Sequence, residues 1–151
     1  MTQPALQLSL RFGPIAQMAR HRAALPRHWV TRCLRRALTV PGELAVRVVD
    51  ADEGERLNSQ FRGKAYPTNV LTFTYQHTPQ VVADVVLCAP VVAAEAKAQG
   101  KTLKQHYAHL LVHACLHAQG WDHEQSSTEA HAMEQREIQV LGTLGLPNPY
   151  R

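Results

Sequence analysis

The segment TLKQHYAHLLVHACLHAQG, residues 102–120, constrains the fold more than any other part of the sequence. Its pattern predicts a helix, and apolar side chains occupy much of the circumference of that helix. A helix of this kind is stable only when other elements cover it on several sides. Thr102 could cap its start, and Gly120 could end it in a left-handed turn. The sequence therefore predicts a fold that is built around residues 102–120 as a central, buried helix.

The rest of the chain supplies the elements that could cover this helix. Strands rich in β-branched residues are expected at 6–12, 44–50, 70–75 and 81–88. The last two are close in sequence, so they are expected to pair antiparallel. Further helices are expected at 26–38, 52–61, 89–100 and 126–142, while residues 13–25 fit either a short helix or a loop.

This order of elements predicts an α+β fold, a mixed four-stranded sheet packed with about five helices. The length of 151 residues fits a single domain over residues 1–151. Two pairs of residues have the spacing of a capping box, Asp52 with Glu55 and Ser126 with Glu129. We therefore expect helices to begin at Asp52 and at Ser126.

Composition and charge narrow the class of protein. No apolar run approaches the roughly 20 residues that a membrane span needs, and the amino terminus lacks the pattern of a signal peptide. The cysteines Cys33, Cys88 and Cys115 are far apart, which favours a reducing cytoplasm over a disulfide framework. The net charge of +4 is uneven, with eight arginines and one acid, Glu43, before Asp50. This asymmetry suits a polyanion such as RNA, or it is a solvated basic face without a partner.

Three histidines, His113, His117 and His123, have the spacing H-x3-H-x5-H. Residues four apart on a helix lie about 40° apart around the axis and roughly 6 Å apart along it, so two imidazoles can reach one ion. Gly120 then reverses the chain and brings His123 back toward the same point. Three neutral imidazoles suit one Zn²⁺ per chain, and an open fourth position is typical of a catalytic site. The pattern predicts a zinc cleft on the central helix.

Two residues near these histidines have more than one interpretation. His109 lies one turn before His113, and it could support a ligand from behind or line the cleft as an ordinary polar residue. Asp122 could hold a ligand ring in place, or it could cap the turn that precedes His123.

The chemistry of such a site depends on what accompanies the metal. Zinc proteases with an H-E-x-x-H motif use the glutamate after the first histidine as general base, and here that residue is Ala114. Phosphodiester cleavage depends more on charge neutralisation by a metal and a guanidinium. The loop RGKAYPTNV offers Arg62 for this role, because an arginine fork binds two phosphate oxygens, although an ordinary basic loop is the alternative. Candidates for holding the flanking RNA backbone are Lys64 and the arginines of the basic helix, Arg32, Arg35 and Arg36.

The segments NSQFRGKAYPTNVLTF and HLLVHACLHAQGWDH together resemble the YbeY family of bacterial single-strand-specific endoribonucleases and rRNA maturation factors, over residues 43–150. The resemblance implies an α+β fold with one zinc ion, and it implies that the zinc ligands are His113, His117 and His123. It matches the family's functional arginine to Arg62. The family's strand with Gly-Asp reads Ala83-Asp84 here, so Asp84 is expected to face the cleft. The sequence departs from the family's metal motif at three residues, Ala114, Ala118 and Trp121. None of them is a ligand, so the departures concern local packing.

The resemblance further implies a zinc-dependent endoribonuclease that acts in 16S rRNA 3′-end maturation and ribosome quality control. Its partners would be single-stranded RNA and the small ribosomal subunit. Two alternatives stay open: a non-catalytic ribosome-assembly factor whose zinc is structural, and a zinc metalloprotease, which Ala114 disfavours. Attack by water and attack by the RNA 2′-hydroxyl are both open, since the residues identify no general base.

Overall fold

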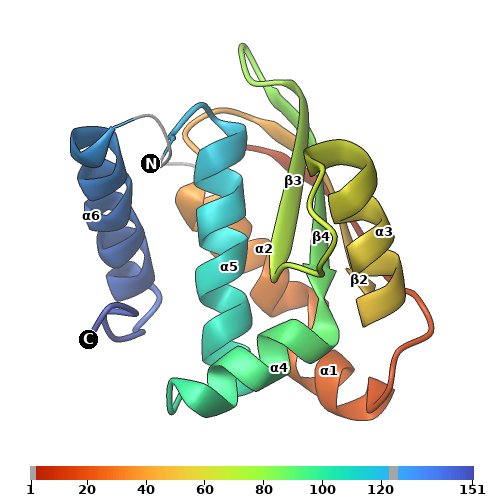
Figure 1. Ribbon diagram of the computed structural model, residues 1–151. Helices are drawn as coiled ribbons and strands as arrows, with labels where there is room; N and C mark the ends of the chain where they lie inside the picture. The colour runs from red at the N-terminus through yellow and green to blue at the C-terminus, as the bar shows by residue number, and fades with distance from the viewer. Residues whose placement is uncertain (1–2, 123–125) are drawn as a thin grey trace.

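The computed structural model describes residues 3–122 and 126–151, and Figure 1 shows the arrangement of their strands and helices. The elements follow in the order β1 (Leu6–Phe12), α1 (Met18–Ala24), α2 (Arg27–Ala37), β2 (Gly42–Val49), α3 (Ala51–Arg62), β3 (Val70–Gln76), β4 (Val81–Cys88), α4 (Ala89–Ala98), α5 (Leu103–Ala118) and α6 (Ser127–Thr143). The strands form one sheet in the order β1-β2-β4-β3. β1, β2 and β4 run parallel, and β3 is antiparallel to β4. The predicted α+β fold with a mixed four-stranded sheet is confirmed.

The start of the chain adds a helix to the expected number. Residues 13–25, which fit a helix or a loop by sequence, contain the short helix α1, so the described residues form six helices rather than about five. α1 begins after Gln17, whose φ of 58° lies in the left-handed region.

Side-chain caps mark the start of three helices. Thr102 caps α5 in a complete capping box with Gln105, and Ser126 caps α6 by accepting a hydrogen bond from the Glu129 backbone N–H. The expected start of α3 at Asp52 is wrong, because Asp50 is the cap and accepts from the Glu53 N–H at 2.8 Å. β2 ends at Val49, so Asp50 is the first residue that can cap the helix.

α5 occupies the centre of the helical layer, as its composition predicts. It contacts α2, α4 and α6 and the strands β3 and β4, and Figure 1 shows it between α6 and the sheet. Tyr107, Leu111 and Cys115 on this helix are fully buried. None of the described helices has both the length and the apolar composition that crossing a bilayer requires.

Each face of the sheet is covered by its own cluster of buried apolar side chains. On the α5 side, side chains from neighbouring strands form buried rows such as Val46 beside Val85. On the other face, α3 covers a smaller cluster of Val49, Leu71 and Val86. Alternate residues of a strand point to opposite faces, so both faces of β4 are apolar where helices cover them. This packing sets α3 against the sheet and brings its last turn close to β3.

Candidate functional site

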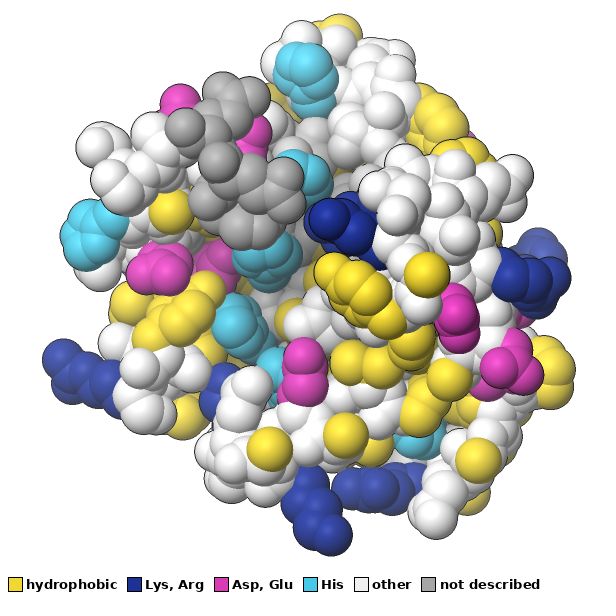
Figure 2. Space-filling model, viewed as in Figure 1, with side chains coloured by type: hydrophobic (Ala, Val, Ile, Leu, Met, Phe, Trp, Pro, Cys, Tyr) yellow, Lys and Arg dark blue, Asp and Glu magenta, His cyan; other side chains and the backbone are white. Residues whose placement is uncertain are grey.

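A cleft of about 500 Å³ brings the two described histidines of the motif together with Arg62. His113 and His117 come from consecutive turns of α5, and residues 70–73 of β3 form another part of the wall. α3 ends at Arg62 because Gly63 adopts a left-handed φ of 70°, and the Gly63 N–H donates to a carbonyl of the last turn. Figure 2 shows histidine side chains gathered in a hollow at the centre of this face, with a basic side chain at its edge.

Hydrogen bonds fix the same tautomer at both histidines. The Nδ1 of His113 lies 2.6 Å from Oε2 of Glu137, and the Nδ1 of His117 lies 3.1 Å from the Trp121 carbonyl oxygen. A carboxylate and a carbonyl can only accept, so both Nδ1 atoms donate, and in the neutral imidazole this places the lone pair on Nε2. Histidine ligands of metals are commonly oriented in this way. The donor chemistry of His113 and His117 therefore fits a zinc ion.

Glu137, on α6, is a component of this site that the sequence prediction missed. Its side chain is fully buried and accepts hydrogen bonds from His109 Nε2 at 2.9 Å, from His113 and from the Tyr150 hydroxyl. Burial alone disfavours the ionised carboxyl, but the hydrogen bonds from the two histidines and from Tyr150 outweigh it and hold its pKa at about 2. Burial and the hydrogen bond to Glu137 raise the pKa of Tyr150 above its usual range. Glu137 is therefore a carboxylate that anchors His113.

A sequence signal for Glu137 does exist. It occupies the buried stripe of α6 together with Met133, Val140 and Leu141, at the spacing of an apolar helix face. A glutamate in such a stripe is almost never buried without a partner. The signal reports that a partner exists, but only the packing of α6 on α5 shows that the partners are His109 and His113.

One turn before His109 on α5, His106 contacts a second carboxylate, that of Glu95. His106 is buried, and its Nε2 donates to Oε1 of Glu95 at 2.8 Å. The same oxygen accepts from the Asn69 side-chain amide at 3.0 Å, and Asn69 lines the cleft. Burial lowers the pKa of His106, while Glu95 acts in the opposite direction. His106 is thus linked by hydrogen bonds through Glu95 to Asn69 in the cleft wall, whereas His109 shares Glu137 with His113.

The structure does not place the predicted third histidine, and it sets Asp122 outside the cleft lining. His123 lies outside the described residues, so the predicted third ligand is not placed. Within residues 3–122 and 126–151, no group of three His, Cys, Asp or Glu side chains is arranged to hold a metal. Asp122 lines a neighbouring groove with Trp121 and Glu129.

Asp84 is not among the residues that line the histidine cleft. Asp84 lies on β4 in a groove with Glu43 and Tyr75. The Tyr75 hydroxyl donates to Asp84 Oδ2 at 2.8 Å, and this hydrogen bond raises the pKa of Tyr75. The run VVADVVLC is apolar on both of its faces, so its pattern could not assign Asp84 to one side of the sheet.

The four basic residues predicted to hold the flanking RNA backbone lie outside the cleft lining. Arg32, Arg35 and Arg36 belong to α2, which packs against α5 and α6. Arg36 donates from Nη1 to the Thr143 carbonyl at 2.8 Å. Lys64 is exposed in the loop after α3. The structure therefore brings Arg62, but not the other four cations, beside His113 and His117.

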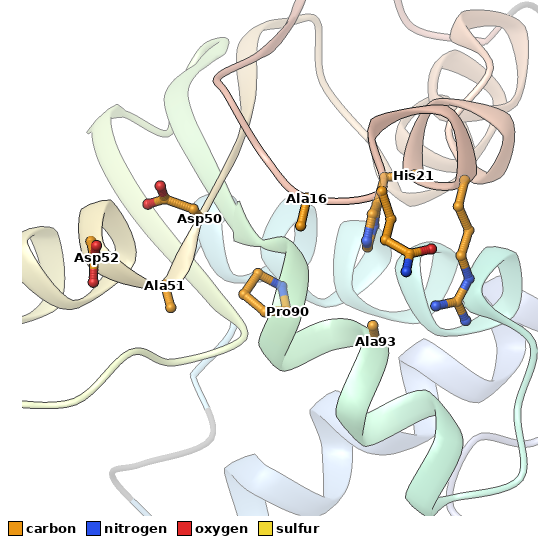
Figure 3. A pocket seen from close by; sticks show the side chains of 9 residues that line it. Ala16, His21, Asp50, Ala51, Asp52, Pro90 and Ala93 are labelled. Atoms are coloured by element: carbon orange, nitrogen blue, oxygen red, sulfur yellow. The ribbon is translucent and has the colours of Figure 1, made fainter.

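A separate cavity of about 480 Å³ lies between α1, the start of α3 and α4. His21 and Asp50 lie on opposite sides of it (Figure 3). His21 is 3% exposed, and its Nδ1 lies 2.7 Å from the Tyr107 hydroxyl. Burial, aided by Arg20, lowers the pKa of His21. None of the predicted site residues that the structure describes lines this cavity.

Comparison with known proteins identifies the family. A family model described as Endoribonuclease YbeY matches residues 17–145. The chain is 59% identical over 145 residues to the Endoribonuclease YbeY of Albidiferax ferrireducens, covering 96% of this chain and 97% of that protein. It is 56% identical over 151 residues to that of Polaromonas naphthalenivorans, covering 100% of each. The solution structure of TM1509 from Thermotoga maritima has the same fold, with a TM-score of 0.58 and 22% identity over 91% of each chain. Because a family model and full-length relatives agree, the chain belongs to the YbeY family of endoribonucleases.

Proposed function

We propose that this protein is a zinc-dependent, single-strand-specific endoribonuclease that acts in 16S rRNA 3′-end maturation and ribosome quality control. The observation that carries the proposal is the convergence of His113, His117 and Arg62 in one cleft, with Nδ1 of both histidines held by an oxygen acceptor. His113, His117 and His123 would hold one zinc ion. The names of the relatives in Albidiferax and Polaromonas support RNA as the substrate.

The residues of the cleft have distinct tasks in this chemistry. Zinc, when bound, would supply a Lewis acid that polarises a phosphoryl oxygen or lowers the pKa of water. Arg62 would bind the scissile phosphate and neutralise the charge that develops on its oxygens during attack. Glu137 would keep His113 in the ligating tautomer, and Asn69, held by Glu95, offers the cleft a polar side chain in a fixed position.

Replacement of Arg62 tests this proposal. Zinc-loaded wild type, Arg62→Ala and Arg56→Ala would be purified identically and given an end-labelled single-stranded RNA. Arg56 is an exposed arginine on the same helix that does not line the cleft, so it controls for lost charge. We expect the wild type and Arg56→Ala to cut, and Arg62→Ala to cut about 10²-fold more slowly with an unchanged zinc content. Equal cutting by all three proteins would contradict a role for Arg62.

The products and substrates separate the remaining possibilities. A 5′-phosphate on the product means that water attacked, and a cyclic phosphate means that the 2′-hydroxyl attacked. Stable association with small ribosomal subunits, with maturation intact in Arg62→Ala, would favour an assembly factor with structural zinc. Casein hydrolysis that survives Arg62→Ala would favour a protease.

We further propose that residues 1–151 act as one domain in the cytoplasm, with the small ribosomal subunit as partner. The central position of α5 supports the single domain, because elements from both ends of the chain pack against it. Unfolding followed by Trp fluorescence and by circular dichroism should then give one coincident transition.

A further inference from the structure

Phe61 is an aromatic side chain that the wall of the cleft leaves exposed. Five large apolar or aromatic residues are exposed in the described part of the chain, namely Phe61, Tyr66, Tyr75, Trp121 and Tyr150. Phe61, 58% exposed, is the one of these that lines the cleft with Arg62, His113 and His117. Folding therefore buries less than half of the surface of this residue, and the rest stays accessible to a ligand.

The ring of Phe61 is nevertheless held in place. Its centroid lies 5.0 Å from that of Phe73, with an angle of 66° between the planes, which is an edge-to-face contact. Phe73 is itself packed on the cluster of Val49, Leu71 and Val86. One contact with an anchored neighbour thus orients the Phe61 ring, while the residue lines the cleft and stays more than half exposed.

Arg62, the next residue after Phe61, could bind the phosphate of the same nucleotide whose base contacts Phe61. Phe61 and Arg62 are consecutive residues in the last turn of α3, and both line the cleft. A nucleotide likewise presents a flat base beside a charged phosphate. An aromatic ring can stack on any base, because every base has a π face, and an arginine binds phosphate oxygens. In a duplex both faces of an internal base are already covered by its neighbours, whereas in a single strand they can be exposed.

We propose that Phe61 stacks on a base of single-stranded RNA next to the phosphate that Arg62 contacts. This inference rests on the proposed function and deepens it, since it names a residue that selects single strands over duplexes. Phe61 acts by binding and orienting the substrate. Leucine keeps an apolar side chain but has no ring, so Phe61→Leu removes stacking together with the edge-to-face contact to Phe73, which the unfolding midpoint monitors.

The test compares intact RNA with abasic RNA. Fluorescence anisotropy would measure binding of a labelled single strand, and of the same strand with one base removed at each position in turn, by zinc-loaded wild type, Phe61→Leu, Phe61→Tyr and Tyr75→Leu. Tyr75 is an exposed aromatic residue outside the cleft lining, so its replacement is the matched control. Cleavage rates, zinc content and unfolding midpoints would be measured on the same samples.

We expect Phe61→Leu to weaken binding of intact RNA roughly tenfold, with Phe61→Tyr and Tyr75→Leu close to wild type. When the base is missing at one particular position, the affinity of the wild type should fall by the same factor. The affinity of Phe61→Leu should not fall further at that position. If wild type cuts RNA but Phe61→Leu binds intact RNA equally well, or keeps its full penalty at every abasic position, the stacking inference is overturned and the proposed function stands. If wild type neither binds nor cuts RNA, the proposed function fails and this inference fails with it.

Discussion

At the scale of single residues, the site depends on a carboxylate that touches neither the solvent nor the substrate. Glu137 is fully buried and joins α6 to the two α5 histidines His109 and His113. Its ionised oxygens accept from both imidazoles, so each ring is held in one tautomer and one orientation. A neutral amide in the same place could satisfy only part of this arrangement.

Glu137→Gln should weaken zinc binding about 10–100-fold, because the amide loses the charge and one of the two acceptor oxygens that hold the imidazoles. Competition with a chromophoric chelator measures the affinity. Glu134→Gln, one turn earlier on α6, is the control that changes the same functional group. An unchanged zinc affinity in Glu137→Gln would show that Glu137 does not position His113.

The buried side chain of His21 should influence how the free energy of unfolding depends on pH. Burial lowers the pKa of His21 below its ordinary value of 6.5, and the charged or polar groups around it are Arg20, the Tyr107 hydroxyl, Asp50 and Asp52. The unfolded chain then binds a proton at a higher pH than the folded protein does. Stability from this source is complete above pH 6.5 and is lost as the pH falls from there toward the lowered pKa of the folded state.

His21→Gln should therefore reduce the loss of unfolding free energy between about pH 7.5 and pH 5, since glutamine does not titrate. Urea unfolding at several pH values gives the slope. The comparison concerns the slope and not the absolute stability, which the substitution also changes. The same slope in both proteins would mean that His21 binds its proton equally well in the folded and unfolded states.

At the scale of elements, helix ends decide where the functional side chains lie. α3 stops at Arg62 because Gly63 turns the chain with a φ of 70°. A Cβ added at Gly63 would meet nothing within 4 Å, so the demand for glycine there comes from the backbone alone. Gly142, inside α6, has equally open surroundings but no positive φ.

Gly63→Ala and Gly142→Ala should consequently change stability in opposite directions. Alanine at Gly63 should cost about 1 kcal/mol and disturb the last turn of α3, whereas alanine at Gly142 should stabilise by roughly 0.5–1 kcal/mol. Chemical denaturation measures both. Cleavage should also slow in Gly63→Ala but not in Gly142→Ala. Shifts of the same sign would contradict the role of the left-handed turn.

Sequence patterns predict these elements better than they predict the contacts between them. The composition of residues 102–120 was enough to place α5 at the centre, and the short connection between β3 and β4 was enough to pair them. The sequence predicts the cap of α3 two residues late, because Asp50 and Asp52 are equally good caps until the end of β2 is known. Asp84 and Glu137 needed the register of the sheet and the docking of α6, which no local pattern encodes.

At the scale of the whole molecule, the cleft is a product of packing between distant parts of the chain. Its residues come from α3, the loop before β3, β3 itself and α5, and its supporting carboxylates come from α4 and α6. The central helix alone would present a row of histidines without Arg62 or Glu137. The fold therefore sets a guanidinium beside two histidines of the H-x3-H-x5-H motif.

The most direct measurement is cleavage of one end-labelled RNA, as a single strand and annealed to its complement, by chelator-treated protein before and after one equivalent of Zn²⁺. We expect the treated protein to be inactive, and zinc to restore cutting of the single strand while the duplex stays intact. A His117→Ala variant should not recover under the same conditions. Cutting by the metal-free protein, or a failure of zinc to restore activity to a folded wild type, would contradict a metal-dependent ribonuclease centred on His113, His117 and Arg62.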